Sequence, residues 1–429
     1  MDNKEYLPVN TPNDMKIMDG VKLTTYNNES EYLEITDDTD AIIDNNNDNN
    51  HNETEYLIQK TTEKVKPVKK REYWMDVLRV FANFLVVLTH SAYGKGLKVG
   101  SSNWNNVIMY NSFSRPCVPL FIMISGILFL NPKKEISCKK MFSVYILRIF
   151  KSYIFWTIYY NVFEENIYKY IYDRDNFYNY EKTITETINK TIVSKHNHLW
   201  YLNFVIGLYM VTPIIKKITP DRDITWYACI IFSIISILLP TLYEIFHDYY
   251  HIKEFSIIKN YTDSLIVELS GSYTAYYLLG YLLNKDFTKK IYVYLSIAVG
   301  VLGTVLTFIL RYGYSLQKGK TDFTFANFNS FTVLMESIGM FVFFKYPIKK
   351  LVDGFIDNKP FKTTLMTLSD CSFGIYLLHF SILRLFKTFI PNGTFSSIWW
   401  VPTQALLIYF ICLVIIFVLR KVSIFKVIT

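Results

Sequence analysis

The chain has 429 residues, of which 51% are hydrophobic and 17% aromatic, and its formal net charge is +8. Its basic residues occur in short clusters between long apolar segments, which is typical of a membrane protein and argues against a nucleic-acid partner. The five cysteines have neither paired nor metal-ligand spacing, so the sequence predicts no disulfide framework and no metal site.

The amino-terminal part differs sharply from the rest. It is acidic, rich in Asn and Asp, and contains the low-complexity stretch DNNNDNN. Such a segment buries too little apolar surface to offset the entropy lost on ordering. We therefore expect residues 1–70 to form a disordered acidic tail and residues 71–429 to form one transmembrane domain.

Apolar segments long enough to cross a bilayer predict about ten transmembrane helices. The fold class expected is therefore an all-α polytopic membrane protein. The predicted crossings lie near residues 74–92, 116–131, 142–162, 199–215, 226–246, 264–283, 291–310, 326–345, 365–386 and 398–419.

Loop charges predict the orientation. The stretch KVKPVKKR before the first crossing and the short Lys-rich connections that follow on the same side predict that both termini are cytosolic. Three N-x-[ST] sequons, at Asn189, Asn260 and Asn392, all fall on the opposite side. Their use would make the chain a glycoprotein of a eukaryotic secretory-pathway or plasma membrane.

The first crossing carries four polar residues that hydrocarbon disfavours. Counting about 100° per residue from Asp76, Arg79 falls at about 300°, Asn83 at about 340° and His90 at about 320°. The four side chains therefore share one face, with His90 about 16 Å beyond Arg79 along the helix axis. An Asp76–Arg79 pair can simply anchor a helix end, whereas an intramembrane histidine usually marks a pathway or a reaction centre.

A pair of cations opens the third crossing. Arg148 and Lys151 lie three residues apart near the predicted cytosolic boundary. They could be snorkelling side chains that extend the positive-inside pattern, or they could grip the phosphates of a nucleotide-like donor.

Other polar or small residues lie inside or beside the predicted crossings. Ser125 and Gly126 lie mid-helix, where small residues usually allow close packing, and an interfacial aromatic belt would account for Trp200 and Tyr201. Buried histidines can be satisfied by carbonyls, and buried acids can pair with a cation or line a polar cavity. The remaining candidates are His198, His379, Glu268 and Glu336.

Taken in order, these segments resemble the membrane acyltransferase-3 family. The matching motifs are D-x-L-R with a histidine eleven residues after the arginine, then PLFIMISG, the basic start of the third crossing, HLWYL and SFGIYLLH. The segment LWYLNFVIGLYMVTPII is similar to the glycan O-acetyltransferase subgroup.

The resemblance implies transfer of an acyl group, usually acetyl, from cytosolic acyl-CoA to a hydroxyl of a carbohydrate or lipid-linked glycan across the membrane. Acetyl-CoA is then a donor substrate, with no permanently bound cofactor. The resemblance also implies that His90 is catalytic, supported by Asp76, Arg79 and Asn83. The donor would contact Arg148, Lys151, Ser125 and Gly126; Lys151 stands where the family has arginine.

Several alternatives remain open from the sequence. His90 could act as a general base or carry a transient acetyl group. The loop 163–198 could bind the acceptor or simply connect two helices. A transporter or channel with a polar helix face lining a path is the main alternative function, and an inactive homologue is another.

Overall fold

The computed structural model describes residues 6–8, 21–24, 32–35, 71–94, 96–134, 136–164, 198–265, 271–285, 287, 289–390 and 393–429. The chain divides into two compact units, Met1–Arg71 and Glu72–Thr429. In the first unit three short strands pair antiparallel in the order β1-β3-β2: β1 Tyr6–Pro8, β2 Val21–Thr24 and β3 Tyr32–Ile35. The register aligns Leu33 of β3 with Leu7 of β1 and with Leu23 of β2.

The sequence predicts no strands in this unit. Each strand is only three or four residues long and has a β-branched or aromatic residue at one or both ends, which favours extended backbone. The other tail residues, for which disorder is predicted, lie outside the described residues.

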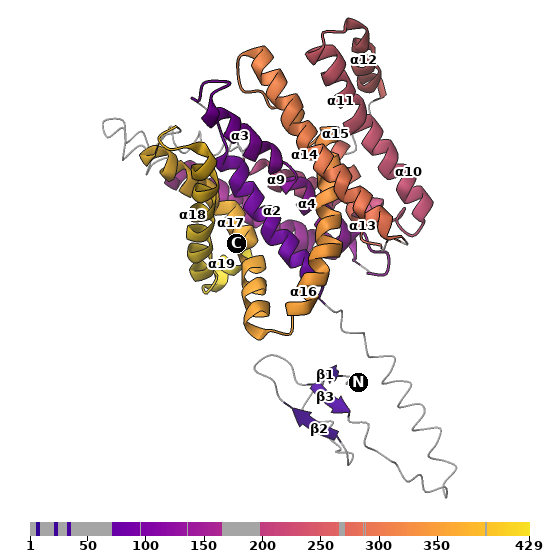
Figure 1. Cartoon of the computed structure of the whole chain (residues 1–429). Coiled ribbons are helices and arrows are strands. Elements are labelled where there is room, and N and C mark those ends of the chain that lie inside the picture. The colour runs from indigo at the N-terminus through magenta and orange to yellow at the C-terminus, as the bar shows by residue number, and fades with distance from the viewer. Residues whose placement is uncertain are drawn as a thin grey trace, which may run out of the picture. The chain divides into compact units, whose positions relative to one another are not determined.

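The described residues of the second unit form helices, which confirms the predicted all-α polytopic fold (Figure 1). Among the described residues, seven helical segments are long and apolar enough to cross a membrane. They are Ser102–Phe129, Cys138–Asn161, Arg222–Tyr249, Lys290–Lys318, Thr324–Phe355, Lys359–Phe389 and Ser397–Leu419.

Three further helices coincide with the remaining predicted crossings: α2 (Tyr73–Ser91), α9 (Trp200–Ile215) and α13 (Gly271–Leu283). Helix α9 is apolar but short, and α2 carries the four polar residues that lower its apolar character. The total of about ten crossings agrees with these helices and stays a prediction.

Four of these spans are built from consecutive helical segments: Ser102–Phe129, Cys138–Asn161, Arg222–Tyr249 and Thr324–Phe355. The segment Ser102–Phe129 contains α3 (Ser102–Phe113) and α4 (Cys117–Phe129), joined by a turn at Pro116. The segment that follows contains α5 (Cys138–Lys140), η1 (Met141–Ile146), α6 (Leu147–Ile158) and η2 (Tyr159–Glu164). The second predicted crossing, 116–131, therefore corresponds to α4, and the sequence does not predict α3 as part of it.

The middle of the chain forms a second group of helices. They are α10 (Arg222–Ser233), η4 (Ile234–Leu238), α11 (Leu239–Tyr243), η5 (Glu244–Tyr249), η6 (Lys253–Phe255) and α12 (Ser256–Leu265), followed after α13 by α14 (Lys290–Lys318), η7 (Thr324–Ala326), α15 (Phe331–Phe343), η8 (Phe344–Ile348) and α16 (Lys349–Phe355). The carboxyl-terminal helices are α17 (Lys359–Phe389), α18 (Ser397–Leu419) and α19 (Ser423–Ile428).

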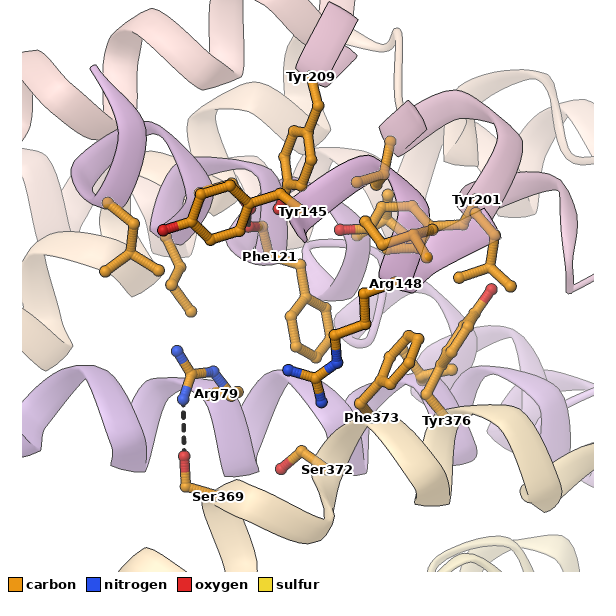
Figure 2. A pocket seen from close by; sticks show the side chains of 18 of the residues that line it. Arg79, Phe121, Tyr145, Arg148, Tyr201, Tyr209, Ser369, Ser372, Phe373 and Tyr376 are labelled. Atoms are coloured by element: carbon orange, nitrogen blue, oxygen red, sulfur yellow. Dashed lines mark hydrogen bonds between the residues drawn. The ribbon is translucent and has the colours of Figure 1, made fainter. Parts of the chain in front are cut away.

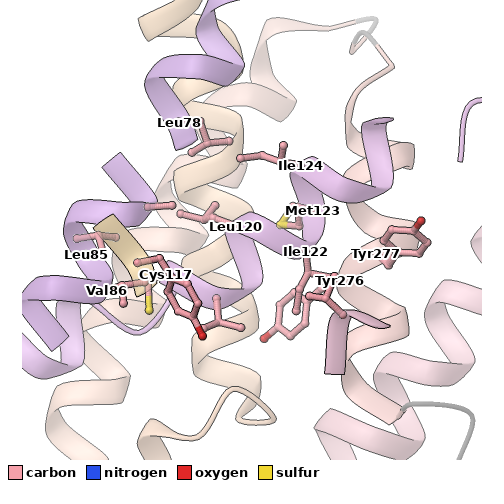
Figure 3. Packing of buried hydrophobic residues seen from close by; sticks show 14 of the residues in the cluster. Leu78, Leu85, Val86, Cys117, Leu120, Ile122, Met123, Ile124, Tyr276 and Tyr277 are labelled. Carbon is pink, nitrogen blue, oxygen red and sulfur yellow. The ribbon is translucent and has the colours of Figure 1, made fainter. Parts of the chain in front are cut away.

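Helix α2 packs against α4, α17 and α18, which places its polar face inside the protein. Its apolar residues join the core with side chains from α4 and α13; Figure 3 shows Leu78 and Leu85 of α2 near Leu120 of α4. Helices α14 and α15 lie along each other and approach closely where Gly300 faces Gly339. A Cβ added to Gly300 would lie only 2.5 Å from the Gly339 Cα, so the contact requires glycine. Such small-residue contacts are a common way to pack helices in a bilayer.

Candidate active site

A cavity of about 450 Å³ lies between α2, α4, α6, α9 and α17. Three arginines from different parts of the chain line it: Arg79 of α2, Arg148 of α6 and Arg420, which directly follows α18. Figure 2 shows the guanidinium groups of Arg79 and Arg148 directed into the same space. Asp370 is also in the lining, so cations outnumber anions there and the cavity favours an anionic ligand.

Arg79 is held in place by two neighbours. Its Nη1 donates to the Ser369 Oγ at 2.8 Å and to the Asp76 Oδ1 at 3.3 Å, and the Ser369 hydroxyl donates to the same Asp76 oxygen at 2.6 Å. Asp76 and Ser369 are buried, while the Arg79 side chain is 29% exposed. The aspartate therefore positions the arginine at the cavity wall.

The polar stripe of α2 faces α17 along its whole length. Asn83, also buried, donates through Nδ2 to the Ser372 carbonyl at 2.9 Å. At the far end the His90 ring lies 5.2 Å from the His379 ring, centroid to centroid. Asn83 therefore joins α2 to α17 two helical turns before His90, through its amide nitrogen.

Three histidines come together above the cavity. The His198 ring lies 5.5 Å from the His379 ring and stacks on Phe380 at 4.9 Å, and the same Phe380 contacts the His90 ring edge-to-face at 5.9 Å. His198 and His379 are buried, and His90 is partly buried. The sequence indicates these residues separately, and the packing makes them one cluster.

The tautomer of His379 follows from its hydrogen bond. Its Nδ1 lies 2.6 Å from the Tyr376 carbonyl, and because a carbonyl only accepts, Nδ1 must donate. The basic lone pair of neutral His379 is then on Nε2, which has no hydrogen-bond partner among the described residues. Such a nitrogen can accept a proton from a bound hydroxyl.

Tyr376 connects the cavity with the histidine cluster. It lines the cavity, its ring lies 6.1 Å from the His379 ring, and its hydroxyl donates to the His198 carbonyl. Tyr201 also lines the cavity and packs edge-to-face against Tyr376 at 5.8 Å (Figure 2). A slender ligand group extending past these rings would approach the histidines.

The carboxyl-terminal segment borders the other end of the cavity. Arg148 donates through Nε to the Val427 carbonyl at 3.3 Å, and Arg420 donates through Nη1 to the Thr429 carbonyl at 2.7 Å. These bonds orient the two side chains while leaving further guanidinium donors, since each arginine has five.

Lys151, expected beside Arg148, is exposed and does not line the cavity. Their spacing alone would put both residues on one side of α6, and the packing of this helix brings only Arg148 to the cavity. The second cation that lines the cavity beside Arg148 is Arg420, not Lys151. In the sequence Arg420 is simply part of the cytosolic charge pattern, although its position directly after the last apolar segment is a usable signal.

Ser125 and Gly126 are adjacent but play different parts. Ser125 lines the cavity and donates to the Phe121 carbonyl of its own helix at 3.0 Å. A Cβ on Gly126 would lie 2.0 Å from the Tyr277 carbonyl oxygen of α13. Gly126 therefore serves the α4–α13 contact rather than a donor site.

The other candidate residues lie away from the cavity or outside the described residues. The Trp200 ring packs on Tyr273 and Phe328, at 6.0 and 5.9 Å. Glu336 is fully buried on α15. It lies at the close contact between α14 and α15, where a Cβ on Gly303 would come within 2.7 Å of the Glu336 backbone nitrogen. Glu268, Asn189, Asn392 and most of the loop 163–198 lie outside the described residues, whereas Asn260 lies on α12.

Ser369 could have been recognised as a candidate from its spacing to other polar residues on α17. Ser369, Ser372, Tyr376 and His379 follow one another at spacings of three, four and three residues, which places them on one helix face. Among the described residues, no group of His, Cys, Asp and Glu is arranged to hold a metal ion.

Fold and cavity together define a multi-pass membrane protein with a cationic pocket whose wall residue Tyr376 packs against a cluster of three histidines. The acyltransferase-3 family model, described as an acyltransferase domain, matches residues 72–421, and the chain belongs to this family of membrane acyltransferases. The resemblance seen in the motifs is thereby confirmed. The comparisons with curated proteins and with solved structures found no match.

Proposed function

We propose that the chain transfers an acetyl group from cytosolic acetyl-CoA to a hydroxyl of a carbohydrate or lipid-linked glycan on the opposite side of the membrane. The observation that carries this proposal is that Tyr376, in the wall of the arginine-lined cavity, packs directly against the histidine cluster. Membership of the family supports acyl transfer as the reaction class.

The donor fits the charge and shape of the cavity. Coenzyme A carries several phosphate charges, which hydrocarbon excludes and which guanidinium groups bind through paired, charge-assisted hydrogen bonds. Arg79, Arg148 and Arg420 offer such donors at one end of a cavity whose remaining lining is largely aromatic and aliphatic. The pantetheine arm would lie along this apolar wall and bring the thioester toward Tyr376.

The chemistry needs a base at the far end of that arm. A neutral imidazole, His90 by family resemblance, takes the proton of the acceptor hydroxyl as the oxygen attacks the thioester carbon. The carbon–sulfur bond breaks, an ester forms, and the departing thiolate receives the proton. His379 lies against His90 and, with its Nε2 lone pair, can orient the hydroxyl or share the proton. Transfer through an acetyl-histidine is the competing route.

The orientation proposed has the start of α2 and Arg148 on the cytosolic side and the end of α2 on the other side. The Lys-rich connections support it, because they fall at the same end of the domain as the arginine-lined cavity. An endomembrane or plasma-membrane location is part of the same proposal, since it depends on use of the predicted sequons.

The test is turnover by the purified full chain with labelled acetyl-CoA and a panel of glycans and lipid-linked sugars. We expect acceptor-dependent release of free CoA, with His90→Ala reducing kcat by about 100-fold or more because a general base is lost. His247→Ala, at a histidine paired with Asp248 on η5 away from the cavity, is the control.

Two results would contradict the proposal. Normal turnover by correctly folded His90→Ala would remove His90 from the chemistry. Movement of a solute across sealed vesicles without acetyl-CoA consumption would instead favour the transporter alternative.

A further inference from the structure

A second cavity, of about 490 Å³, lies beyond the end of α2. Its wall is formed by the loop that follows α2, with Tyr93 and Lys98, and by the loop that follows α14, with Lys320 and Phe323. The proposed reaction leaves this cavity without a role, and from the sequence the loop 163–198 could equally bind the acceptor or simply connect two helices.

This outer cavity lies beside the histidine cluster. Lys387 of α17 donates through Nζ to the His90 carbonyl at 3.1 Å, and the same ammonium group lies 5.2 Å from the centre of the Tyr93 ring. Tyr93 is only three residues beyond His90. One lysine side chain therefore contacts both the backbone of His90 and the cavity wall, at the end of α2 away from Arg79.

The charges around the outer cavity are positive. Lys98 and Lys320 are exposed in its lining, and no carboxylate lines it among the described residues. Close to the Phe323 ring lie the guanidinium groups of Arg311 and Arg115, at 4.6 and 5.4 Å from the ring centre. Lys387 adds a further cation beside Tyr93, so the field of this end of the protein attracts an anion.

The acid that precedes Phe323 in the chain, Asp322, already has cationic and backbone partners. Asp322 accepts from Lys318 Nζ at 3.0 Å and from the Thr324 backbone nitrogen at 2.8 Å. Burial alone would raise the pKa of this carboxyl, but the hydrogen bonds from Thr324 and Lys318 outweigh burial and hold the pKa below its usual value. Its negative charge is thus balanced by Lys318 and does not offset the lysines of the cavity.

The aromatic wall suits a sugar ring. Tyr93 and Phe323 stack at 6.1 Å with their planes 16° apart, and Tyr93 is 45% exposed. A tyrosine of this kind presents an apolar body together with a polar hydroxyl, which matches a ligand with both C–H faces and hydroxyl groups.

We propose that the outer cavity binds the acceptor and that the acceptor is an anionic sugar, with its ring against Tyr93 and its acidic group facing Lys98 and Lys320. A hydroxyl of the same sugar then reaches His90 from the side opposite the donor. This inference rests on the proposed function for its biological meaning, but binding at the cavity can be measured without turnover.

The binding test compares sugars that differ only in charge. Calorimetric titration of the detergent-solubilised full chain would use methyl glucuronide, methyl glucoside and the 6-phosphate of methyl glucoside. We expect the two charged sugars to bind about tenfold or more tighter than the neutral one. Comparing the affinities of the glucuronide and the 6-phosphate then shows whether the site prefers a carboxylate or a phosphate. The double variant Lys98→Gln/Lys320→Gln should lose most of this difference, and Tyr93→Ala should weaken all three.

Matched controls lie on the exposed surface of the same protein. Lys253→Gln and Tyr250→Ala change an exposed lysine and an exposed tyrosine outside the cavity, and both should bind like the unchanged chain. Equal binding of neutral and charged sugars, or an undiminished preference in the double variant, would overturn the inference.

A turnover arm separates this inference from the proposed function. Acetyl-CoA consumption that prefers the charged sugars, with a raised acceptor KM but an unchanged acetyl-CoA KM in the double variant, supports both. Consumption with no charge preference retains the function and rejects the anionic acceptor. Charge-selective binding without any acetyl-CoA consumption retains the site and rejects the function.

Discussion

Asp76 and Arg79 lie on one helix, and the hydroxyl of Ser369 on another helix joins them. Ser369 accepts from the arginine and donates to the aspartate, so all three groups are satisfied in a partly buried place. Losing one member of such a set leaves a buried donor or acceptor without its partner, which usually costs about 1–3 kcal/mol. The predicted Asp76–Arg79 pair is present at 3.3 Å, but it is a three-residue unit whose third member the sequence does not predict.

The arginines of the cavity can be separated from the neighbouring lysine by mutation. Arg148→Gln and Arg420→Gln should each raise the KM for acetyl-CoA by about tenfold or more, because a charge-assisted hydrogen bond contributes about 1.5–3 kcal/mol. The value of kcat should change little if these contacts are the same in the ground state and the transition state. Steady-state kinetics with acetyl-CoA as the varied substrate measures both quantities.

Lys151→Gln is the matched control for that experiment. It removes a cation from the same part of α6, but Lys151 does not line the cavity, whereas Arg148 does. A larger rise in KM for Lys151→Gln than for Arg148→Gln would contradict the assignment of the donor site.

At the scale of helices, the close crossing of α4 and α13 sets the position of the cavity wall. Gly126 of α4 and Gly280 of α13 each lie against the backbone of the other helix, with Cβ positions 2.0 and 2.2 Å from carbonyl oxygens of Tyr277 and Met123. Because Ser125, which lines the cavity, directly precedes Gly126 on α4, a shift of this helix would move the lining of the cavity.

Gly126→Ala should therefore destabilise the protein by about 1–3 kcal/mol, the usual range for overpacking a tight interior. Its thermal unfolding midpoint in detergent should fall relative to the unchanged chain. Gly207→Ala on α9 is the control, since a Cβ there meets nothing within 4 Å and alanine favours helix. An equal midpoint for both variants would show that α4 and α13 can separate without cost.

At the scale of the whole molecule, the orientation of the membrane domain can be tested with its own cysteines. Among the five, Cys138 is exposed and the other four are buried. It lies in the Lys-rich connection NPKKEISCKK, which is proposed to face the cytosol.

An impermeant maleimide applied to sealed microsomes with their cytosolic face outward should label Cys138 without detergent. Cys138→Ser should abolish this labelling. In that background, Lys253→Cys, in the connection proposed to face the lumen, should react only after detergent is added. Labelling of Lys253→Cys in sealed vesicles would reverse the proposed orientation and, with it, the sides assigned to donor and acceptor.

The apolar segments, the polar stripe of α2 and the order of the motifs can be recognised in the sequence alone, and they predict the all-α membrane fold and the family. These features are local, because hydropathy and helical spacing depend only on neighbouring residues. The partners of the stripe cannot be recognised in the same way, since α17 lies almost 300 residues away in the chain.

The amino-acid sequence by itself determined the all-α membrane fold, which face of α2 is polar, and which family the chain belongs to. Only the tertiary structure decided that this face meets α17, that three separate histidines adjoin one phenylalanine, and that Arg420 rather than Lys151 joins Arg148 at the cavity. The physical reason is that these outcomes depend on how closely helices approach and rotate against one another. That geometry is set by backbone contacts such as those of Gly126 and Gly280, between residues distant in the chain.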